Sequence, residues 1–384
     1  MKLARHLSAR DPHEPHRVAT PLELFYDLVI VIAIASVTAG LHHAISEGHG
    51  VAALPKFIFL FLAIWWAWMN FTWFASAFDN DGPLYRILVM VVMSGALIFA
   101  GGADYIFKTM EFSGGLLGWI VMRMGMAALW LRAAVELRFR KTALRYFFGI
   151  LIAQLSWTLL YFGTKPGSTG FFVGGAVCFL IEWLVPMFAE RAGQTPWHRH
   201  HIMERYGLLT IIVLGEILLS VSMGFGLLFG GEPSWAAALS SVSAIIIVFS
   251  LWWLYFEKEE HLTATHYARA FTWGYGHVFF FGAAAALGAG IAAELDLAAH
   301  HSKVGHAVTA WYIGVPLAVA LLTLWTIRDR FHPLGFRSYS LPVMAVGFVV
   351  GAVVGLPSSG FAVICLIALG WRCLYAGSNP SSGH

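Results

Sequence analysis

Apolar segments as long as a membrane-spanning helix recur along the whole of this 384-residue chain. A helix needs about 20 apolar residues to cross the roughly 30 Å hydrocarbon core of a bilayer. Twelve segments meet this pattern, at residues 22–43, 54–76, 84–103, 115–135, 143–163, 170–190, 205–228, 236–256, 268–292, 307–327, 339–355 and 359–376. The last two are short, so they form either two spans or one re-entrant hairpin. The sequence predicts an all-α, polytopic membrane protein with about 12 transmembrane helices.

The composition agrees with a chain surrounded by lipid. The chain is 59% hydrophobic and 12% charged, whereas a soluble domain carries about 25% charged residues. Its net charge of +3 does not indicate a nucleic-acid partner. The basic residues fall in short loops, and membrane proteins place positive residues in such loops to set their topology. We therefore expect the lipid bilayer as a partner, and no nucleic acid. The oligomeric state stays open.

The distribution of positive charge sets the expected orientation. With the amino terminus inside, four lysines fall in outer loops and Arg123 falls within a span, which leaves nineteen of the 24 lysines and arginines on the cytoplasmic side. Positive residues are enriched in the cytoplasmic loops of membrane proteins. The pattern predicts a multi-pass protein of the cytoplasmic membrane, with both termini in the cytoplasm.

The two halves of the chain resemble each other weakly. Residues 23–32 begin the first segment and residues 204–213 begin the seventh, and each stretch opens with Glu followed two residues later by an aromatic residue. Six spans per half is an even number, so both halves enter the membrane from the same side. This predicts a parallel internal repeat. The expected organisation is a cytoplasmic segment, a six-helix half, a linker, a second six-helix half and a cytoplasmic tail, at 1–21, 22–190, 191–204, 205–376 and 377–384.

Two carboxylates stand at the start of the first segment. Thr20, Pro21 and Glu23 form a capping-box pattern, with Thr20 as the N-cap, and this role alone explains Glu23. Asp27 lies one turn later on the same face, where like charges repel. An interior partner or a proton would relieve that repulsion, so Asp27 is the better functional candidate of the two.

Three further charged residues lie inside the apolar segments: Arg123, Glu182 and Glu216. An unpaired charge near the bilayer centre costs about 2.5–3.5 kcal/mol on insertion scales, so we expect Arg123 to pair with a carboxylate, first of all with Glu216 or Asp27. These residues form either a proton, cation or anion site or a buried pair that fixes helix register. The functional interpretation is favoured for Glu216 and the structural one for Glu182, while Arg123 suits both.

Other side chains carry weaker signals. His277 lies inside the ninth segment, as either a proton-relay residue or a packed histidine. Four tryptophans between Trp65 and Trp73 crowd one helix and indicate either an aromatic cavity or ordinary packing. The three cysteines fall in apolar stretches without a CxxC pair, which predicts buried free thiols. We expect no metal and no cofactor, because no standard ligand spacing, mid-helix Schiff-base lysine or P-loop is present.

Two stretches carry a family resemblance. Thr20-Pro-Leu-Glu-Leu-Phe-Tyr-Asp-Leu-Val29 and His201-Ile-Met-Glu-Arg-Tyr-Gly-Leu-Leu-Thr-Ile-Ile-Val-Leu-Gly-Glu216 resemble the two signatures of the bacterial low temperature requirement A (LtrA) family. Tyr26 stands where phenylalanine is more usual. The resemblance covers most of the chain and implies a bacterial inner-membrane protein linked to growth in the cold. It carries over no substrate, and it emphasises Glu23, Asp27, Glu204, Arg205 and Glu216.

These observations favour secondary transport or a related ion-coupled function for an unidentified small solute or ion. Asp27 and Glu216 would be the coupling carboxylates, and Arg123 their partner or an anion clamp. One alternative is a membrane-embedded enzyme acting on a lipid or isoprenoid carrier, for which Glu23/Asp27 and Glu204/Arg205 would serve. The sequence favours an enzyme less, since it contains neither GxSxG nor HExxH. Another alternative is an envelope scaffold or sensor.

Overall fold

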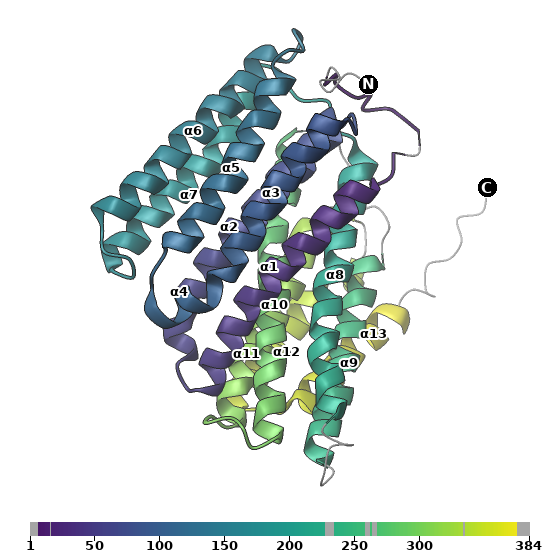
Figure 1. Cartoon of the computed structure of the whole chain (residues 1–384). Helices are drawn as coiled ribbons and strands as arrows, with labels where there is room; N and C mark the ends of the chain where they lie inside the picture. The colour runs from purple at the N-terminus through teal and green to yellow at the C-terminus, as the bar shows by residue number, and fades with distance from the viewer. Residues whose placement is uncertain are drawn as a thin grey trace, which may run out of the picture. The chain divides into compact units, whose positions relative to one another are not determined.

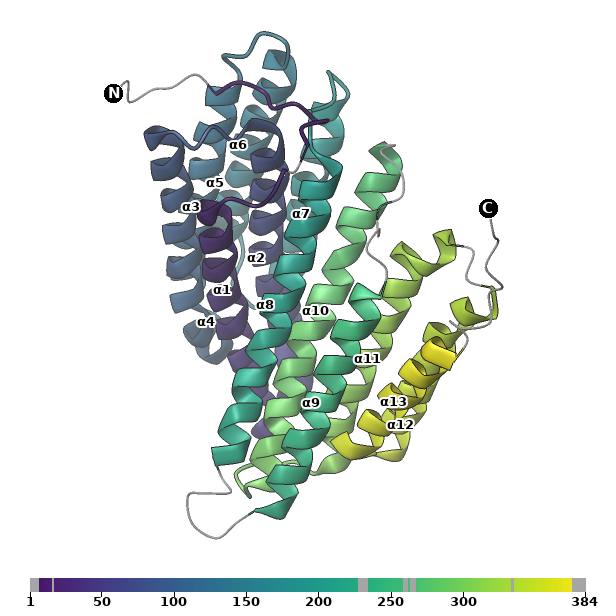
Figure 2. The same cartoon turned by 90° about the vertical axis from the view of Figure 1, so that its right-hand side faces the viewer.

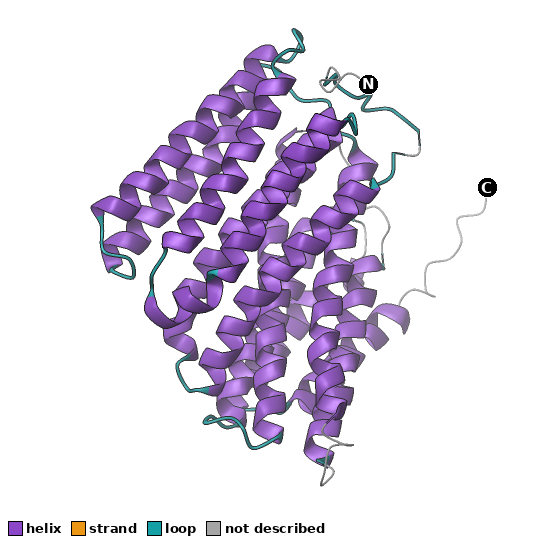
Figure 3. Ribbon diagram, in the orientation of Figure 1, coloured by secondary structure: helices purple, strands orange, loops and turns teal. Residues whose placement is uncertain are grey.

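The computed structural model describes residues 7–15, 17–226, 234–257, 262, 267–332 and 335–374. Within these ranges the chain forms α-helices and two short 3-10 helices, and it contains no strand (Figure 3). The predicted all-α fold class is therefore confirmed. The predicted cytoplasmic tail, 377–384, lies outside the described residues.

The helices follow one another along the chain with short connections (Figure 1). The first seven are α1 (Pro21–Ser46), α2 (Gly50–Phe78), α3 (Pro83–Gly101), α4 (Ala103–Thr109), α5 (Ser113–Ala133), α6 (Arg140–Gly163) and α7 (Thr169–Glu190). The remaining ones are α8 (Arg199–Gly226), α9 (Trp235–Phe256), α10 (Tyr267–Ala298), α11 (His306–Ile327), α12 (Ser340–Val354) and α13 (Ser358–Leu374). The 3-10 helices η1 (Asp329–Phe331) and η2 (Gly335–Tyr339) connect α11 to α12.

Eleven helical stretches in the described ranges are long and apolar enough to cross a membrane, and the shorter apolar helix at Ser358–Cys373 follows them. The eleventh stretch, Gly335–Val354, reaches spanning length only when η2 is added to α12. Many large apolar side chains on these helices are exposed, such as Val346 at 64% and Phe162 at 79%. Apolar outer faces of this extent suit a lipid surrounding, so the chain is a multi-pass membrane protein.

The helices form two compact units. The first holds the residues up to Val37 together with Ile58–Tyr206, and the second holds Thr38–Phe57 together with the residues from Gly207 onward. The unit boundaries fall inside α1, α2 and α8, so each of these three helices contributes a stretch to both units. The predicted parallel repeat of 22–190 and 205–376 stays a prediction.

Glycines bring α3 and α5 of the first unit into close contact. A Cβ atom placed on Gly118 would lie 2.5 Å from the backbone nitrogen of Phe99, and one on Gly95 would lie 2.5 Å from the backbone nitrogen of Met122. These distances leave no room for a side chain, so the two helix backbones pack directly against each other. Farther along, α5 packs on α6 and α6 packs on α7.

In the second unit, α11 packs between α10 and α12, and α13 lies beside α9 and α12 (Figure 2). Gly290 of α10 closes the first of these contacts, because its missing Cβ would meet the carbonyl oxygen of Tyr312 at 2.2 Å. Gly355 ends α12 with a φ of +73°, a left-handed conformation that glycine adopts without strain. All three cysteines are free, and the prediction that all are buried is wrong for Cys373, which is exposed near the end of α13.

Candidate functional site

The start of α1 has the capping geometry that the sequence predicts. The backbone nitrogen of Thr20 donates to Oε2 of Glu23 at 2.7 Å, and the backbone nitrogen of Glu23 donates to Oγ1 of Thr20 at 3.3 Å. Each residue satisfies one of the amide groups that a helix start leaves without an intrahelical partner. One oxygen of the Glu23 carboxylate is occupied in this way, and the other, Oε1, faces charged groups of other segments.

Arg205 of α8 bridges the two acids of α1. Its Nη2 donates to Oδ1 of Asp27 at 2.5 Å, and its Nε donates to Oδ2 of the same carboxylate at 3.1 Å. Its Nη1 lies 3.0 Å from Oε1 of Glu23, outside hydrogen-bonding geometry, so that contact is electrostatic. All three side chains are fully buried. The predicted repulsion between Glu23 and Asp27 is therefore relieved by an interior cation.

Two basic residues of α8 match the spacing of the two acids of α1. Nε2 of His201 lies 3.0 Å from Oε1 of Glu23, again outside hydrogen-bonding geometry. His201 and Arg205 are four residues apart, as are Glu23 and Asp27, and residues at this spacing share one face of a helix. The two helices thus present complementary pairs to each other. This matched spacing is a sequence signal for the contact, although His201 was not among the residues predicted for the site.

Two residues outside the helices complete the arrangement. Nη2 of Arg17 lies 3.6 Å from a carboxylate oxygen of Asp79 and 3.8 Å from Oε1 of Glu23. Asp79 follows the end of α2, and burial raises the pKa of its carboxyl group. We call the whole set the α1–α8 charge cluster: Arg17, Glu23, Asp27, Asp79, His201 and Arg205. Arg17 and Asp79 were not predicted as site residues, because no local sequence pattern distinguishes them from ordinary loop charges.

The predicted motif residue Glu204 lies at the edge of this cluster. Its carboxylate accepts a hydrogen bond from the backbone nitrogen of Ala19 at 3.2 Å. The side chain is partly exposed, in contrast to those of Glu23, Asp27 and Arg205. Glu204 therefore ties the segment before α1 to the start of α8.

A second buried ion pair lies in the first unit. Nη2 of Arg123 in α5 donates to Oε2 of Glu182 in α7 at 2.5 Å, and both side chains are at most 1% exposed. The expectation that Arg123 pairs first with Glu216 or Asp27 is therefore wrong. Depth in the membrane was the basis of that expectation. Helix packing decides the partner instead, because α5 and α7 both pack against α6 and their buried residues meet within one helix cluster.

Two tryptophans of α2 each donate a hydrogen bond to the carboxylate of a different ion pair. Nε1 of Trp66 donates to Oε2 of Glu182 at 3.0 Å, and Nε1 of Trp68 donates to Oδ1 of Asp27 at 2.7 Å. Residues two apart on a helix project about 200° from each other, so the two indoles leave opposite sides of α2. Between them, the carbonyl oxygen of Ala67 accepts a hydrogen bond from the hydroxyl of Tyr26 at 3.1 Å. Trp66 and Trp68 are therefore packed core residues that also supply hydrogen-bond donors to buried carboxylates.

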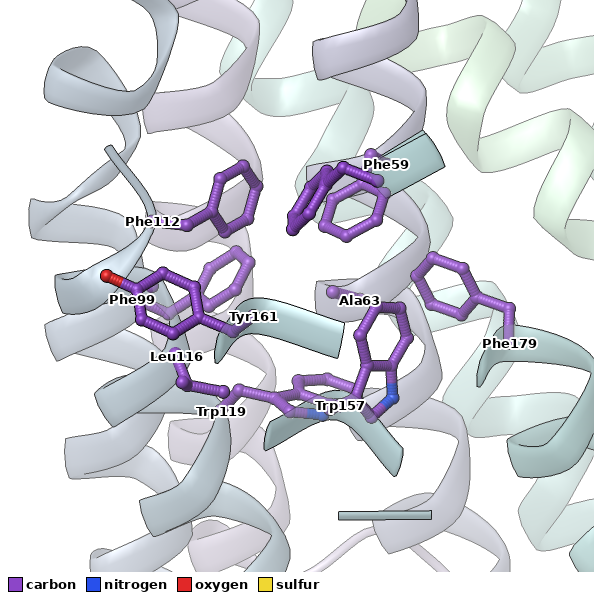
Figure 4. A pocket seen from close by; sticks show the side chains of 11 residues that line it. Phe59, Ala63, Phe99, Phe112, Leu116, Trp119, Trp157, Tyr161 and Phe179 are labelled. Carbon is purple, nitrogen blue, oxygen red and sulfur yellow. The ribbon is translucent and has the colours of Figure 1, made fainter. Parts of the chain in front are cut away.

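An aromatic cavity lies near the second ion pair, in the first unit (Figure 4). Eight of its eleven lining residues are aromatic, and its volume is about 30 Å³. That space holds one or two water-sized occupants, whereas a cavity that binds benzene measures about 150 Å³. One lining residue, Trp119, has its ring centroid 5.6 Å from the guanidinium carbon of Arg123. The cavity therefore adjoins a buried charge but is too small for an organic substrate in this conformation.

The remaining predicted residues lie in the second unit. Glu216 of α8 is partly buried, and within the described residues its carboxyl group forms no ion pair and no side-chain hydrogen bond. His277 of α10 is fully buried, and its Nδ1 donates to the carbonyl oxygen of Trp273 at 2.8 Å. Its Nε2 therefore accepts a hydrogen bond from the Tyr255 hydroxyl, 3.1 Å away. These bonds make His277 a hydrogen-bonded core residue.

The second unit also holds a network of arginines and acids. Arg372 of α13 contacts Glu257 at 2.7 Å and Asp329 at 2.8 Å, and Arg337 contacts Glu257 at 2.8 Å. Arg328 donates to Asp329 at 2.7 Å and to the carbonyl oxygen of Tyr255 at 3.0 Å. The network links the ends of α9, α11 and α13. In the described part of the chain, no group of three or more His, Cys, Asp or Glu side chains lies close enough to hold a metal ion.

The fold and the site together define a class: an all-helical, multi-pass membrane protein in which several charged side chains are buried in ion pairs. A sequence model of the bacterial low temperature requirement A protein family (LtrA) matches residues 18–373. The chain therefore belongs to the LtrA family. It is also similar to the uncharacterized protein RA0937 of Rhizobium meliloti (strain 1021), with 23% identity over 388 residues that cover 91% of this chain and 88% of that protein.

Proposed function

We propose that this protein is a secondary transporter or a related ion-coupled membrane protein, and that the α1–α8 charge cluster is its proton-binding site. One observation carries the proposal. The cluster contains three carboxylates and two arginines, so it holds one unmatched negative charge when His201 is neutral. A single proton, taken up by His201 or by a carboxylate, makes the cluster neutral.

Because the cluster is buried, binding of that proton has a large effect on its electrostatic energy. Removing the oppositely charged partner of a buried charge destabilises the protein by about 3–5 kcal/mol, because the remaining charge contacts neither water nor a counter-charge. Glu23, Asp27, His201 and Arg205 are each fully buried, so solvent does not compensate the unmatched charge. Burial raises the pKa of the Asp79 carboxyl group, so this acid of the cluster binds a proton more readily than it would in water. His201, whose Nε2 lies 3.0 Å from Oε1 of Glu23, is the other group of the cluster that can take up the proton.

No neighbouring group described here cancels the unmatched negative charge of the cluster. Arg10 is paired with Glu14, with Nη2 and Oε2 2.6 Å apart, and reaches Asp79 only at 4.0 Å. Glu204 adds a negative charge that is partly exposed and hydrogen-bonded to Ala19. His198 lies before α8, and burial lowers the pKa of its imidazole, so it is neutral at pH 7. None of these groups supplies a buried positive charge to the cluster.

Protonation would change how α1 and α8 hold each other. A proton on Glu23 weakens its attraction to Arg205 and Arg17, and a proton on His201 strengthens the contact with Glu23. Because each state favours a different strength of contact between the two helices, proton binding shifts the population of their arrangements. This is the coupling that an ion-driven transporter needs. Glu216, which has no ion pair in the described chain, is proposed as the second coupling carboxylate.

The first test measures proton-driven charge movement in the full chain. Protein reconstituted on a solid-supported membrane and exposed to a pH jump from 8 to 6 should give a transient current, which reports proton binding without knowledge of the solute. We expect His201→Gln and Glu216→Gln to abolish the current. Lys108→Gln, which removes an exposed lysine paired with Asp104, is the matched control and should leave the current unchanged.

Two outcomes would count against the proposal. One is a wild-type current no larger than that of a protein-free membrane. The other is a full current in His201→Gln and Glu216→Gln variants that remain monodisperse and melt at the wild-type temperature. Turnover of a lipid by the purified protein without any gradient would instead favour a membrane-embedded enzyme.

A further inference from the structure

We propose that the groove between α6 and α7 binds an anionic phospholipid, with the acyl chain in the groove and the phosphate at the end where α6 begins. The groove lies on the first unit and has a volume of about 440 Å³. Its walls are Leu144, Phe148, Ile152, Ile181, Leu184 and Phe188, with Arg145 at one end. Lipid binding in this groove does not depend on the proposed transport function.

The shape of the groove fits a hydrocarbon chain. Phe148, Ile152 and Leu184 are between 55% and 61% exposed, so these side chains stand at the surface of the helix pair. The lining from Leu144 to Ile152 runs about 12 Å along α6, at 1.5 Å per residue. Gly149 forms the base of the groove, where a Cβ atom would lie 2.6 Å from Cγ1 of Val185, so the two helices approach closely there. The result is a long apolar slot rather than a closed pocket.

The charge at one end of the groove specifies the headgroup. Nη1 of Arg145 donates to the carbonyl oxygen of Phe188 at 3.1 Å, and its guanidinium carbon lies 4.6 Å from the centroid of the Phe188 ring. These two contacts hold Arg145 where the slot ends. Four exposed cations surround the same end of the helix pair: Arg138, Arg140, Lys141 and Arg191. The acids nearby are Glu136 and the buried Glu190, so positive charge predominates.

The buried acid at this end, Glu190, is already hydrogen-bonded within the protein. Glu190 accepts hydrogen bonds from the Tyr146 hydroxyl at 2.9 Å and from the backbone nitrogen of Thr195 at 2.8 Å. Its carboxylate therefore points into the protein. The N-terminus of α6 adds a further positive element, since its N-cap residue Phe139 provides no side-chain hydrogen bond. Unsatisfied amide groups at a helix start attract phosphate, and basic groups at a span end attract anionic headgroups.

Native mass spectrometry of the full-length protein tests this assignment. The protein is released from micelles that contain phosphatidylglycerol and phosphatidylcholine with identical acyl chains at equal concentration. We expect the wild type to retain phosphatidylglycerol preferentially. Each of Lys141→Gln and Arg145→Gln should lower that preference about fivefold, the effect of removing one cation near a lipid headgroup. Free glycerol phosphate should not displace the lipid.

A second pair of variants tests the groove itself. Ile152→Trp fills the slot, whereas Leu155→Trp adds the same ring to α6 at a residue that is 58% exposed and does not line the groove. Only Ile152→Trp should reduce phosphatidylglycerol retention. Equal retention of the two lipids by the wild type would mean bulk annular contact and would overturn the proposal. Equal effects of the two tryptophans, or displacement by glycerol phosphate, would overturn the groove as the acyl-chain site.

Discussion

Asp27 and Arg205 are joined by two side-chain hydrogen bonds, Nη2 to Oδ1 at 2.5 Å and Nε to Oδ2 at 3.1 Å, although 178 residues separate them. This two-pronged geometry is the strongest form of an arginine–carboxylate pair. It joins the beginning of α1 to the beginning of α8, the two stretches that carry the family signatures. The pair also leaves Arg205 close enough to Glu23 for one cation to serve both acids.

Breaking this pair on one side should destabilise the protein. Arg205→Met leaves Asp27 and Glu23 buried without their cation, and we expect a loss of about 3–5 kcal/mol in unfolding free energy. The double variant Asp27→Leu/Arg205→Met should recover part of the loss, because no unpaired charge remains at Asp27. Unfolding in mild detergent measures both. Arg86→Met, which breaks an exposed pair with Asp81, should cost at most about 1 kcal/mol.

The partner of Arg123 can be verified with double variants. Arg123→Met and Glu182→Met should each destabilise the protein, and the two changes together should cost less than their sum, since they share one ion pair. The combination of Arg123→Met with Glu216→Met should be additive. Additivity in the first combination and coupling in the second would argue for the pairing that the sequence suggested and against the one described here.

The indole of Trp68 should contribute to stability through its hydrogen bond to Asp27. Trp68→Phe keeps an aromatic ring but removes the donor at 2.7 Å. Hydrogen bonds to charged groups contribute about 1.5–3 kcal/mol, so we expect a loss in that range. Trp252→Phe is the control, because Trp252 is 47% exposed on α9. A melting temperature of Trp68→Phe equal to that of Trp252→Phe would contradict this role.

The stability contributed by Asp79 should depend on pH. Burial raises the pKa of Asp79 above its unfolded value, so between the two values the native state binds more protons than the unfolded state. Stability therefore falls as pH rises from about 3.9, the unfolded pKa, to the raised native value, and then stays level. Asp79→Asn should be more stable than the wild type at pH 7 and equal to it near pH 4. Thermal unfolding at both pH values measures this, and a destabilised Asp79→Asn at pH 7 would show that its ion pair with Arg17 outweighs burial.

Adding even a methyl group at the contact between α3 and α5 should destabilise the protein. In Gly118→Ala the new Cβ would lie 2.5 Å from the backbone of Phe99, which forces the helices apart, and overpacking of this kind costs about 1–3 kcal/mol. Gly114→Ala lies on the same helix with nothing within 4 Å of the added atom, and it should be neutral or slightly stabilising. Similar melting temperatures for the two variants would rule out this close contact.

The sequence by itself determined the class of fold and the family. Apolar runs of spanning length have one stable outcome in a bilayer, because a helix satisfies its own backbone hydrogen bonds. The capping box at Thr20 and Glu23 was also predictable, since it depends on four consecutive residues. The depth of Arg123 in an apolar segment was enough to require a carboxylate partner.

Only the tertiary structure decided which charges meet. Asp27 pairs with Arg205, and Arg123 pairs with Glu182, because helices far apart in sequence pack side by side and bring one face of each together. Glu216 lies in the same α8 as Arg205, yet it belongs to the second unit and meets no charged partner among the described residues. Local spacing specifies which side chains share a helix face. Helix packing determines which face of another helix lies against it, and that packing depends on contacts spread over the whole chain.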